Sequence, residues 1–251
     1  MTGRSLDVVS DGLRLDAGIE VPPGPRGVAI LLHGIPSIAP LDPDDRGYPG
    51  LAERFAAEGW AAAWGDMRAA RKSPGYFSIE GWVKDALALV EAARAAVPVA
   101  GPAVLLGSSA GGAVSAEAIR RGAPVDALVL LAAPAAWLSF ADDPAEGVFR
   151  IRAGAGMELS PETLEDPAQW ATEFEGVTTQ VSIADVRVPV LVVHGTADDV
   201  VPVEHAAQIA AAAPAAQLEI LEGAGHQLRR DERAVALVLR WLDSTFPRTQ
   251  S

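Results

Sequence analysis

Short, continuous apolar runs alternate with amphipathic stretches along this chain, and the alternation limits the possible folds more than any other feature. The runs are Val28–Leu32, Val104–Leu106, Leu128–Leu131 and Val190–Val193, with Ala61–Trp64 and Leu218–Leu221 as shorter examples. Such runs are typical of strands buried on both faces of a parallel sheet. Ahead of them, Leu6–Val9 and Leu13–Val21 predict a strand pair with a turn at Asp11-Gly12.

Apolar residues recur at three- and four-residue spacing between these runs, which predicts amphipathic helices. The helical stretches are Gly50–Glu58, Ile79–Ala96, Gly111–Arg121, Val203–Ala213 and Glu232–Phe246. Strands that alternate with helices imply right-handed crossovers and a mostly parallel, twisted sheet with helices on both faces. Ligands of such sheets bind at the carboxyl ends of the strands, so the residues that follow the runs are the first functional candidates.

Length and composition agree with one α/β domain or a core with a modest insertion, since 49% of the 251 residues are hydrophobic. No stretch reaches the roughly 18 consecutive apolar residues that span a membrane, and Met1–Asp16 lacks the apolar centre of a signal peptide. The absence of cysteine excludes disulfides, thiolate metal ligands and a cysteine nucleophile. We therefore expect a cytoplasmic protein without membrane association.

The net charge of −13 opposes nucleic-acid binding, because the phosphates would be repelled. The tightest basic group, Arg68, Arg71 and Lys72, is interpreted as part of a solvated loop. No pair of histidines and no carboxylate cluster has the spacing of metal ligands, so no metal is expected. No Gly-x-Gly-x-x-Gly follows the first parallel strand, and Gly154-Ala155-Gly156 is interpreted as a flexible turn.

The alternation stops in residues 134–187, where no strong strand pattern occurs. Ser160-Pro161 and Asp166-Pro167 each place a capping side chain before a proline suited to a first helical turn. Apolar area comes from Trp137, Phe140, Phe149, Trp170 and Phe174. We expect residues 1–133 and 188–251 to form the core and 134–187 a small helical cap that supplies a substrate pocket, rather than a plain surface insertion.

Gly107-Ser108-Ser109-Ala110-Gly111 follows one apolar run and opens a helical stretch. In the pattern Gly-x-Ser-x-Gly, a sharp strand-to-helix turn holds the serine in a strained conformation, and small residues on either side let strand and helix approach. The hydroxyl then projects above the sheet beside a helix N-terminus that favours developing negative charge. Ser109 is therefore the candidate nucleophile.

A serine nucleophile needs a base, and the chain offers His33, His194, His205 and His226. His33 and His194 each end an apolar run before a glycine and are interpreted as structural. His205 lies in a helical stretch and is expected at the surface. His226 follows the last strand in a glycine-rich loop that can carry an imidazole back over the sheet edge, so it is the candidate general base.

The base in turn needs a carboxylate that fixes its tautomer and stabilises the imidazolium. Asp198 and Asp199 both follow the run Val190–Val193, at the carboxyl edge of the sheet. Asp142 and Asp143 follow an earlier strand and offer an alternative position for the acid.

From about Gly27 to Leu242 the chain resembles the α/β-hydrolase superfamily, in which nucleophile, acid and histidine occur in this order. The resemblance rests on His33-Gly34, on Gly107–Gly111, on His194–Pro202 read as His-Gly-x-x-Asp-x-x-Val-Pro, and on Gly225-His226. It implies that Asp198 is the acid. It does not resolve the branch, which could be a serine esterase, dienelactone-hydrolase-like or acylaminoacyl-peptidase-like.

The same resemblance implies an oxyanion hole made by the backbone N–H groups of Ile35 and Ala110, each worth about 3 kcal/mol in the transition state. One departure from the family pattern is Asp66–Ser73, where many relatives carry Asp-x-Arg-Gly-x-Gly-x-Ser and this chain lacks both glycines. Asp66 and Arg68 are expected to pair with each other.

The resulting expectation is a serine hydrolase that cleaves a carboxylic ester of a small-molecule acyl substrate through an acyl-enzyme, without a cofactor. Pro36, Trp137 and Val200 are candidate pocket residues. An acyltransferase, thioesterase or peptidase could use the same groups, and a non-catalytic ligand-binding protein of this fold is a further alternative. Serine at the nucleophile position argues against the aspartate-dependent dehalogenases and epoxide hydrolases. The sequence does not predict the oligomeric state.

Overall fold

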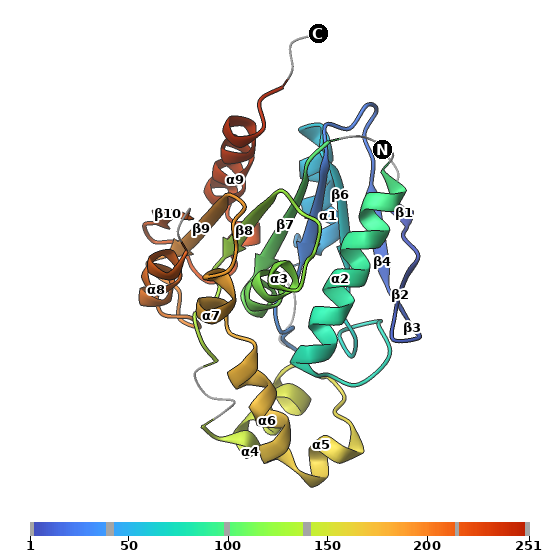
Figure 1. Ribbon diagram of the computed structural model, residues 1–251, viewed down its shortest axis with the longest axis vertical. Helices are drawn as coiled ribbons and strands as arrows, with labels where there is room; N and C mark the ends of the chain where they lie inside the picture. The colour runs from blue at the N-terminus through green and yellow to red at the C-terminus, as the bar shows by residue number, and fades with distance from the viewer. Residues whose placement is uncertain (1–2, 39–42, 98–100, 138–141, 214–215, 249–251) are drawn as a thin grey trace.

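The computed structural model describes residues 3–38, 43–97, 101–137, 142–213 and 216–248. Its centre is a twisted eight-stranded sheet with the order β1-β4-β6-β5-β7-β8-β9-β10 (Figure 1). Its strands are β1 (Arg4–Ser5), β4 (Ala17–Glu20), β5 (Val28–Leu32), β6 (Ala61–Gly65), β7 (Ala103–Ser108), β8 (Ala127–Leu131), β9 (Val190–Gly195) and β10 (Ala216–Leu221). The neighbouring strands β6, β5, β7, β8, β9 and β10 are all parallel to one another. At the other edge of the sheet, β4 pairs antiparallel with β6, and β1 pairs antiparallel with β4. The predicted α/β-hydrolase fold is therefore confirmed.

The N-terminal strand pair forms as predicted but ends early. β2 (Val8–Ser10) and β3 (Leu13–Leu15) make a two-stranded antiparallel sheet. Asp11 and Gly12 turn between them with φ of 47° and 79°, the positive values that a tight hairpin turn requires. The predicted strand Leu13–Val21 breaks at Asp16, because the backbone of Asp16 bonds to Ser73 and Asp66 in the loop after β6.

Helices cover both faces of the sheet. The helices that the sequence predicts are α1 (Gly47–Ala57), α2 (Ile79–Ala96), α3 (Ala110–Arg120), α8 (Glu204–Ala212) and α9 (Glu232–Thr245). Alternate residues of β5 point to opposite cores: Ile30 packs with α2 and α3, and Leu31 with α1 and α9. No described helix is both long and apolar enough to cross a membrane.

A helical segment lies between β8 and β9 and forms the lower part of the molecule in Figure 1. It contains α4 (Pro144–Phe149), a π-helical turn (Arg150–Gly154), α5 (Pro161–Glu165), α6 (Pro167–Gly176) and α7 (Thr179–Ile183). Ser160 and Asp166 cap α5 and α6 as predicted, by accepting from the N–H groups of Thr163 and Gln169. Asp143, considered above as an acid, instead caps α4.

The aromatic residues of this segment have different environments. Trp170 and Phe174 are buried, with ring centroids 4.9 Å apart. Phe149 is 62% exposed, so it contributes little to the core. Phe140 lies outside the described residues.

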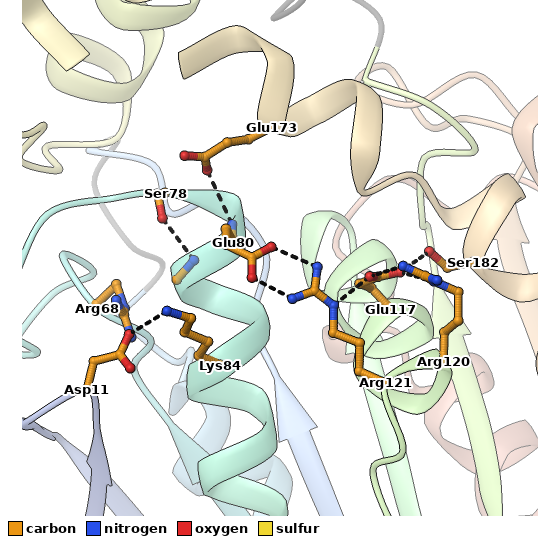
Figure 2. A network of polar contacts seen from close by, with 11 residues as sticks. Asp11, Arg68, Ser78, Glu80, Lys84, Glu117, Arg120, Arg121, Glu173 and Ser182 are labelled. Carbon is orange, nitrogen blue, oxygen red and sulfur yellow. Dashed lines mark hydrogen bonds and ion pairs between the residues drawn. The ribbon is translucent and has the colours of Figure 1, made fainter. Parts of the chain in front are cut away.

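A polar network joins the helical segment to α2 and α3 (Figure 2). The fully buried carboxylate of Glu117 on α3 accepts hydrogen bonds from Arg121 Nε at 2.6 Å and from Ser182 Oγ of α7 at 2.7 Å. Glu173 of α6 accepts from the N–H of Glu80 in the first turn of α2 at 3.3 Å. These contacts fix α6 and α7 relative to α2 and α3.

The expected pair of Asp66 and Arg68 is wrong. Arg68 Nη2 lies 2.7 Å from the fully buried carboxylate of Asp85 on α2, while Asp66 pairs with Arg71 at 2.8 Å. The side chain of Arg68 is only 11% exposed, so it does not belong to a solvated loop. A buried carboxylate requires a charged partner, and α2 brings Asp85 within reach of Arg68.

Candidate active site

Ser109 lies at the turn between β7 and α3, in a backbone conformation that L-residues rarely adopt. Its φ and ψ are 53° and −127°, and its N–H donates to the carbonyl of Leu131 at the end of β8. A Cβ on Gly107 would lie 2.3 Å from the carbonyl oxygen of Gly111, so only glycine allows strand and helix to come this close. The local strain is thus held by packing on both sides of the turn.

The loop after β5 lies against this serine. A Cβ on Gly34 would come within 2.7 Å of the Cβ of Ser109, and a Cβ on Gly111 within 2.5 Å of the carbonyl oxygen of His33. The adjacent strands β5 and β7 therefore deliver Gly34 and Ser109 to the same point at the carboxyl edge of the sheet.

Ser109, His226 and Asp198 form a continuous chain of hydrogen-bonding distances. His226 Nε2 lies 3.1 Å from Ser109 Oγ, and His226 Nδ1 lies 2.8 Å and 3.0 Å from the two carboxylate oxygens of Asp198. The carboxylate fixes a proton on Nδ1, which leaves Nε2 free to accept the serine proton. Three residues distant in sequence thus form a serine–histidine–aspartate constellation.

The carboxylate of Asp198 is fully buried and held by backbone donors. The N–H groups of Val200 and Val201 donate to Oδ1 at 2.9 Å and 2.8 Å. Burial raises the pKa of Asp198, but these donors together with His226 outweigh burial and hold the pKa below its ordinary value. The neighbouring Asp199 is exposed, so the structure brings Asp198 to His226.

The two backbone amides considered for an oxyanion hole flank the serine. Ala110 is the first residue of α3, so its N–H has no acceptor within the helix. Ile35 follows Gly34, whose Cα faces the Ser109 side chain. The two N–H groups thus belong to the segments that border Ser109, the first turn of α3 and the loop after β5.

Two of the other histidines have structural bonds. His33 is buried and accepts from the N–H of Met67 at 2.9 Å, and burial lowers its pKa to about 3. The prediction that His205 lies at the surface is wrong, since it is 5% exposed and its Nδ1 accepts from the N–H of Ala135. Burial lowers the pKa of His205. His205 shares the inward face of α8 with Ala206 and Ile209.

The candidate pocket residues lie in different environments. Pro36 is half-buried in the loop that carries Ile35, and Val200 is 62% exposed beside Asp198. Trp137 is 8% exposed, packs edge-on against Phe174 with centroids 5.3 Å apart, and donates to the carbonyl of Val177. The structure thus brings Val200 to the acid, while Trp137 lies mostly in the core.

An ion pair that the sequence does not predict supports the His226 loop. Arg229, three residues after His226, binds Asp45 through two hydrogen bonds of 2.7 Å and 2.5 Å, and its guanidinium lies 5.4 Å from the Tyr48 ring. Both charged side chains are mostly buried, at 13% and 5% exposure. Nothing in either local segment signals a partner so distant in sequence.

We predict that Asp45→Asn destabilises the protein near neutral pH. Arg229 holds the pKa of Asp45 at about 2, below its ordinary value of 3.8, so this stabilisation is present above pH 4 and lost as the pH falls through 2. Urea unfolding should show a loss of about 1–2 kcal/mol at pH 7, shrinking toward pH 2. Glu53→Gln, in the exposed pair with Arg46, is the control with little expected effect. An equal loss in both variants would contradict the role of the pair.

Comparisons with known proteins now give the class. Solved structures with TM-scores near 0.7 cover almost the whole chain, so they share its α/β-hydrolase fold. The sequence model of the family described as "Serine aminopeptidase, S33" matches residues 23–168, more than half of the chain. The chain belongs to this family of the α/β-hydrolase superfamily and is a hydrolase. A second family model, "TAP-like protein", matches residues 155–248.

The similar solved structures include enzymes of different activities. Est1E from Butyrivibrio proteoclasticus, solved with ferulic acid, is 21% identical with a TM-score of 0.70, covering 96% of this chain and 97% of its own. The esterase EaEST from Exiguobacterium antarcticum is 17% identical, with a TM-score of 0.68 and coverages of 98% and 100%. The meta-cleavage product hydrolase CumD from Pseudomonas fluorescens IP01 is 18% identical, with a TM-score of 0.67 and coverages of 95% and 97%.

A relative with higher sequence identity matches only in part. An uncharacterized protein of Mycobacterium tuberculosis is 45% identical over 87 residues, which are 34% of this chain and 25% of that protein.

Among the described residues, no group of three or more histidine, aspartate or glutamate side chains is arranged to hold a metal ion.

Proposed function

We propose that this hydrolase is a serine esterase, with Ser109 as nucleophile, His226 as general base and Asp198 as the supporting acid. The observation that carries the proposal is the continuous chain from Ser109 Oγ through His226 to Asp198, with distances of 3.1 Å and 2.8 Å. The positive φ of Ser109 supports it, because backbone strain of this kind is typical of a serine held out above a sheet.

The geometry supports a two-step acyl transfer. Ser109 Oγ attacks the ester carbonyl carbon while its proton passes to His226 Nε2, and the carbonyl oxygen becomes an oxyanion held by the N–H groups of Ile35 and Ala110. The intermediate expels the alcohol, which takes the proton from His226. Water then gives a proton to His226 Nε2 as its oxygen attacks the acyl-enzyme carbonyl carbon. The bond to Ser109 Oγ breaks, His226 returns the proton to Oγ, and the acid is released.

The helical segment 134–187 is proposed to act as a cap beside this site. The N–H of Ile38, in the loop that carries Ile35, donates to the carbonyl of Gly154 at 3.1 Å. A Cβ on Gly156 would lie 3.1 Å from Ile38, so this middle part of the segment lies directly against that loop. Ile38 and the π-helical turn are therefore proposed to border the acyl pocket.

An ester is the proposed substrate because the site contains groups for acyl transfer, and one of the structurally similar enzymes, EaEST, is named as an esterase. The named meta-cleavage product hydrolase and the family's name raise carbon–carbon and peptide bonds as alternatives.

We expect wild-type protein to release p-nitrophenol from carboxylic esters, with one preferred acyl length in a series from acetate to long-chain acids. The preferred length measures the depth of the acyl pocket. The same series as p-nitroanilides tests amide cleavage, and a synthetic meta-cleavage product tests carbon–carbon cleavage. Faster turnover of a p-nitroanilide or of the synthetic meta-cleavage product than of every ester would contradict the ester assignment. The assignment of Ser109 as nucleophile would not be affected by that result.

A further inference from the structure

His194 contacts the proposed acid although no step of the reaction uses it. It is the penultimate residue of β9, is fully buried (0% exposed), and its Nε2 lies 3.2 Å from Asp198 Oδ2. The same nitrogen lies 2.9 Å from the carbonyl oxygen of Val201. An imidazole at this position therefore contacts both the acid and the loop that holds the acid.

The neighbouring atoms fix the tautomer of His194. The carbonyl oxygen of Val201 can only accept, so Nε2 carries the proton. Nδ1 is buried and has no hydrogen-bond partner among the described residues, so a proton placed there would be an unsatisfied buried donor. The Nε2–H group is therefore directed at the Val201 carbonyl, with Asp198 Oδ2 at 3.2 Å.

The Nε2–H group of His194 influences both carboxylate oxygens of Asp198, one through Val201 and the other by lying close to it. The carbonyl of Val201 accepts from His194, while the N–H of the same residue donates to Asp198 Oδ1 at 2.8 Å. One residue thus connects the imidazole to the first carboxylate oxygen. The second oxygen lies beside Nε2 and accepts from His226 Nδ1 at 2.8 Å. Movement of His194 would therefore displace both oxygens.

We infer that His194 is a positioning residue that sets the orientation of the Asp198 carboxylate toward His226. The inference rests on the proposed function for its catalytic consequence, but its geometry does not. The titratable groups around the ring are Asp198 and His205 of α8, and burial lowers the pKa of His205. No charged partner other than Asp198 competes for the Nε2 proton within the described residues.

The first test is independent of activity. In protein labelled with ¹⁵N-histidine, the spectrum should show the His194 proton on Nε2, the tautomer that the contact with the Val201 carbonyl requires. The proton that His226 shares with Asp198 resonates far downfield, and His194→Leu should shift or broaden this signal. His205→Leu is the matched control, since it removes another buried imidazole with one backbone partner and should leave the signal in place. An unchanged signal in His194→Leu would overturn the inference.

The second test follows the catalytic consequence. His194→Leu should lower kcat on the best ester about ten- to a hundredfold with little change in KM, because a misplaced acid leaves substrate binding intact. His194→Gln should recover most of the loss, since its amide nitrogen reaches the position of Nε2, whereas His194→Asn should not. Comparison of Gln with Asn keeps the test decisive if the leucine variant does not fold. Equal kcat in the Gln and Asn variants would overturn the inference.

The two tests separate this inference from the proposed function. A downfield signal that depends on His194, in a protein that neither hydrolyses esters nor reacts at Ser109, would remove the proposed function and leave the positioning role. An active esterase whose kcat and downfield signal are both insensitive to His194→Leu would support the proposed function and overturn the positioning role of His194.

Discussion

Replacing Ser109 by alanine is expected to reduce ester hydrolysis about 10⁶-fold in kcat, which places it at the level of the uncatalysed reaction in most assays. The reason is that Ser109 Oγ is the hydroxyl that His226 Nε2 contacts, at 3.1 Å, among the residues that the structure describes. The fold should survive, because the substitution removes one half-buried oxygen and keeps the Cβ at the turn. Circular dichroism and thermal unfolding would check this alongside the initial rates.

Ser108→Ala is the matched control for this result. The two serines are adjacent and both are half-buried. A reading of the sequence pattern shifted by one residue would assign Ser108 as the nucleophile. Ser108 ends β7, whereas only Ser109 has the positive φ and the contact with His226. Retention of most activity in Ser108→Ala, with loss in Ser109→Ala, is the expected outcome. Loss in Ser108→Ala alone would place the nucleophile elsewhere.

Asp198→Asn is expected to have the second-largest effect, a loss of about 10⁴-fold in kcat near neutral pH. An asparagine amide can donate to His226 Nδ1, which would move the imidazole proton to Nε2 and leave no acceptor for the serine proton. The same substitution turns an acceptor of two backbone N–H groups into a mixed donor and acceptor. The pH–rate profile of the variant should be measured over the whole stable range.

Asp199→Asn provides the comparison for this variant, since it removes the same charge one residue away on an exposed side chain. It should keep the wild-type rate and pH profile. If both variants lost activity alike, the loss would reflect the net charge of the loop and not the contact with His226.

The parallel strands could be predicted from sequence because strands buried on both faces read as unbroken apolar runs. Val28–Leu32 and the long helix Ile79–Ala96 form with the predicted bounds. Short helices were missed where tertiary contacts stabilise them: α7 has only five residues and packs against α3 and α8. Short isolated helices are marginal in water, so their own sequence carries a weak pattern.

The environments of individual polar residues were harder to predict. His205 lies in an alanine-rich helix whose two faces differ little in polarity, so the buried side could not be recognised from its sequence. The partners of Arg68 and Arg229 were missed because they depend on where a distant helix or loop comes to lie. Motifs predicted where the candidate site residues occur in the chain, but not what surrounds them.

The most direct test of the account is reaction with a fluorophosphonate followed by peptide mass mapping. The nucleophile, the base and the oxyanion donors must all be in place for this reaction, while no substrate preference is assumed. The account predicts a single adduct on Ser109 in folded protein, absent after heat denaturation and absent in Ser109→Ala. An unreactive folded protein, or an adduct on a different residue, would contradict it and favour a ligand-binding role for the fold.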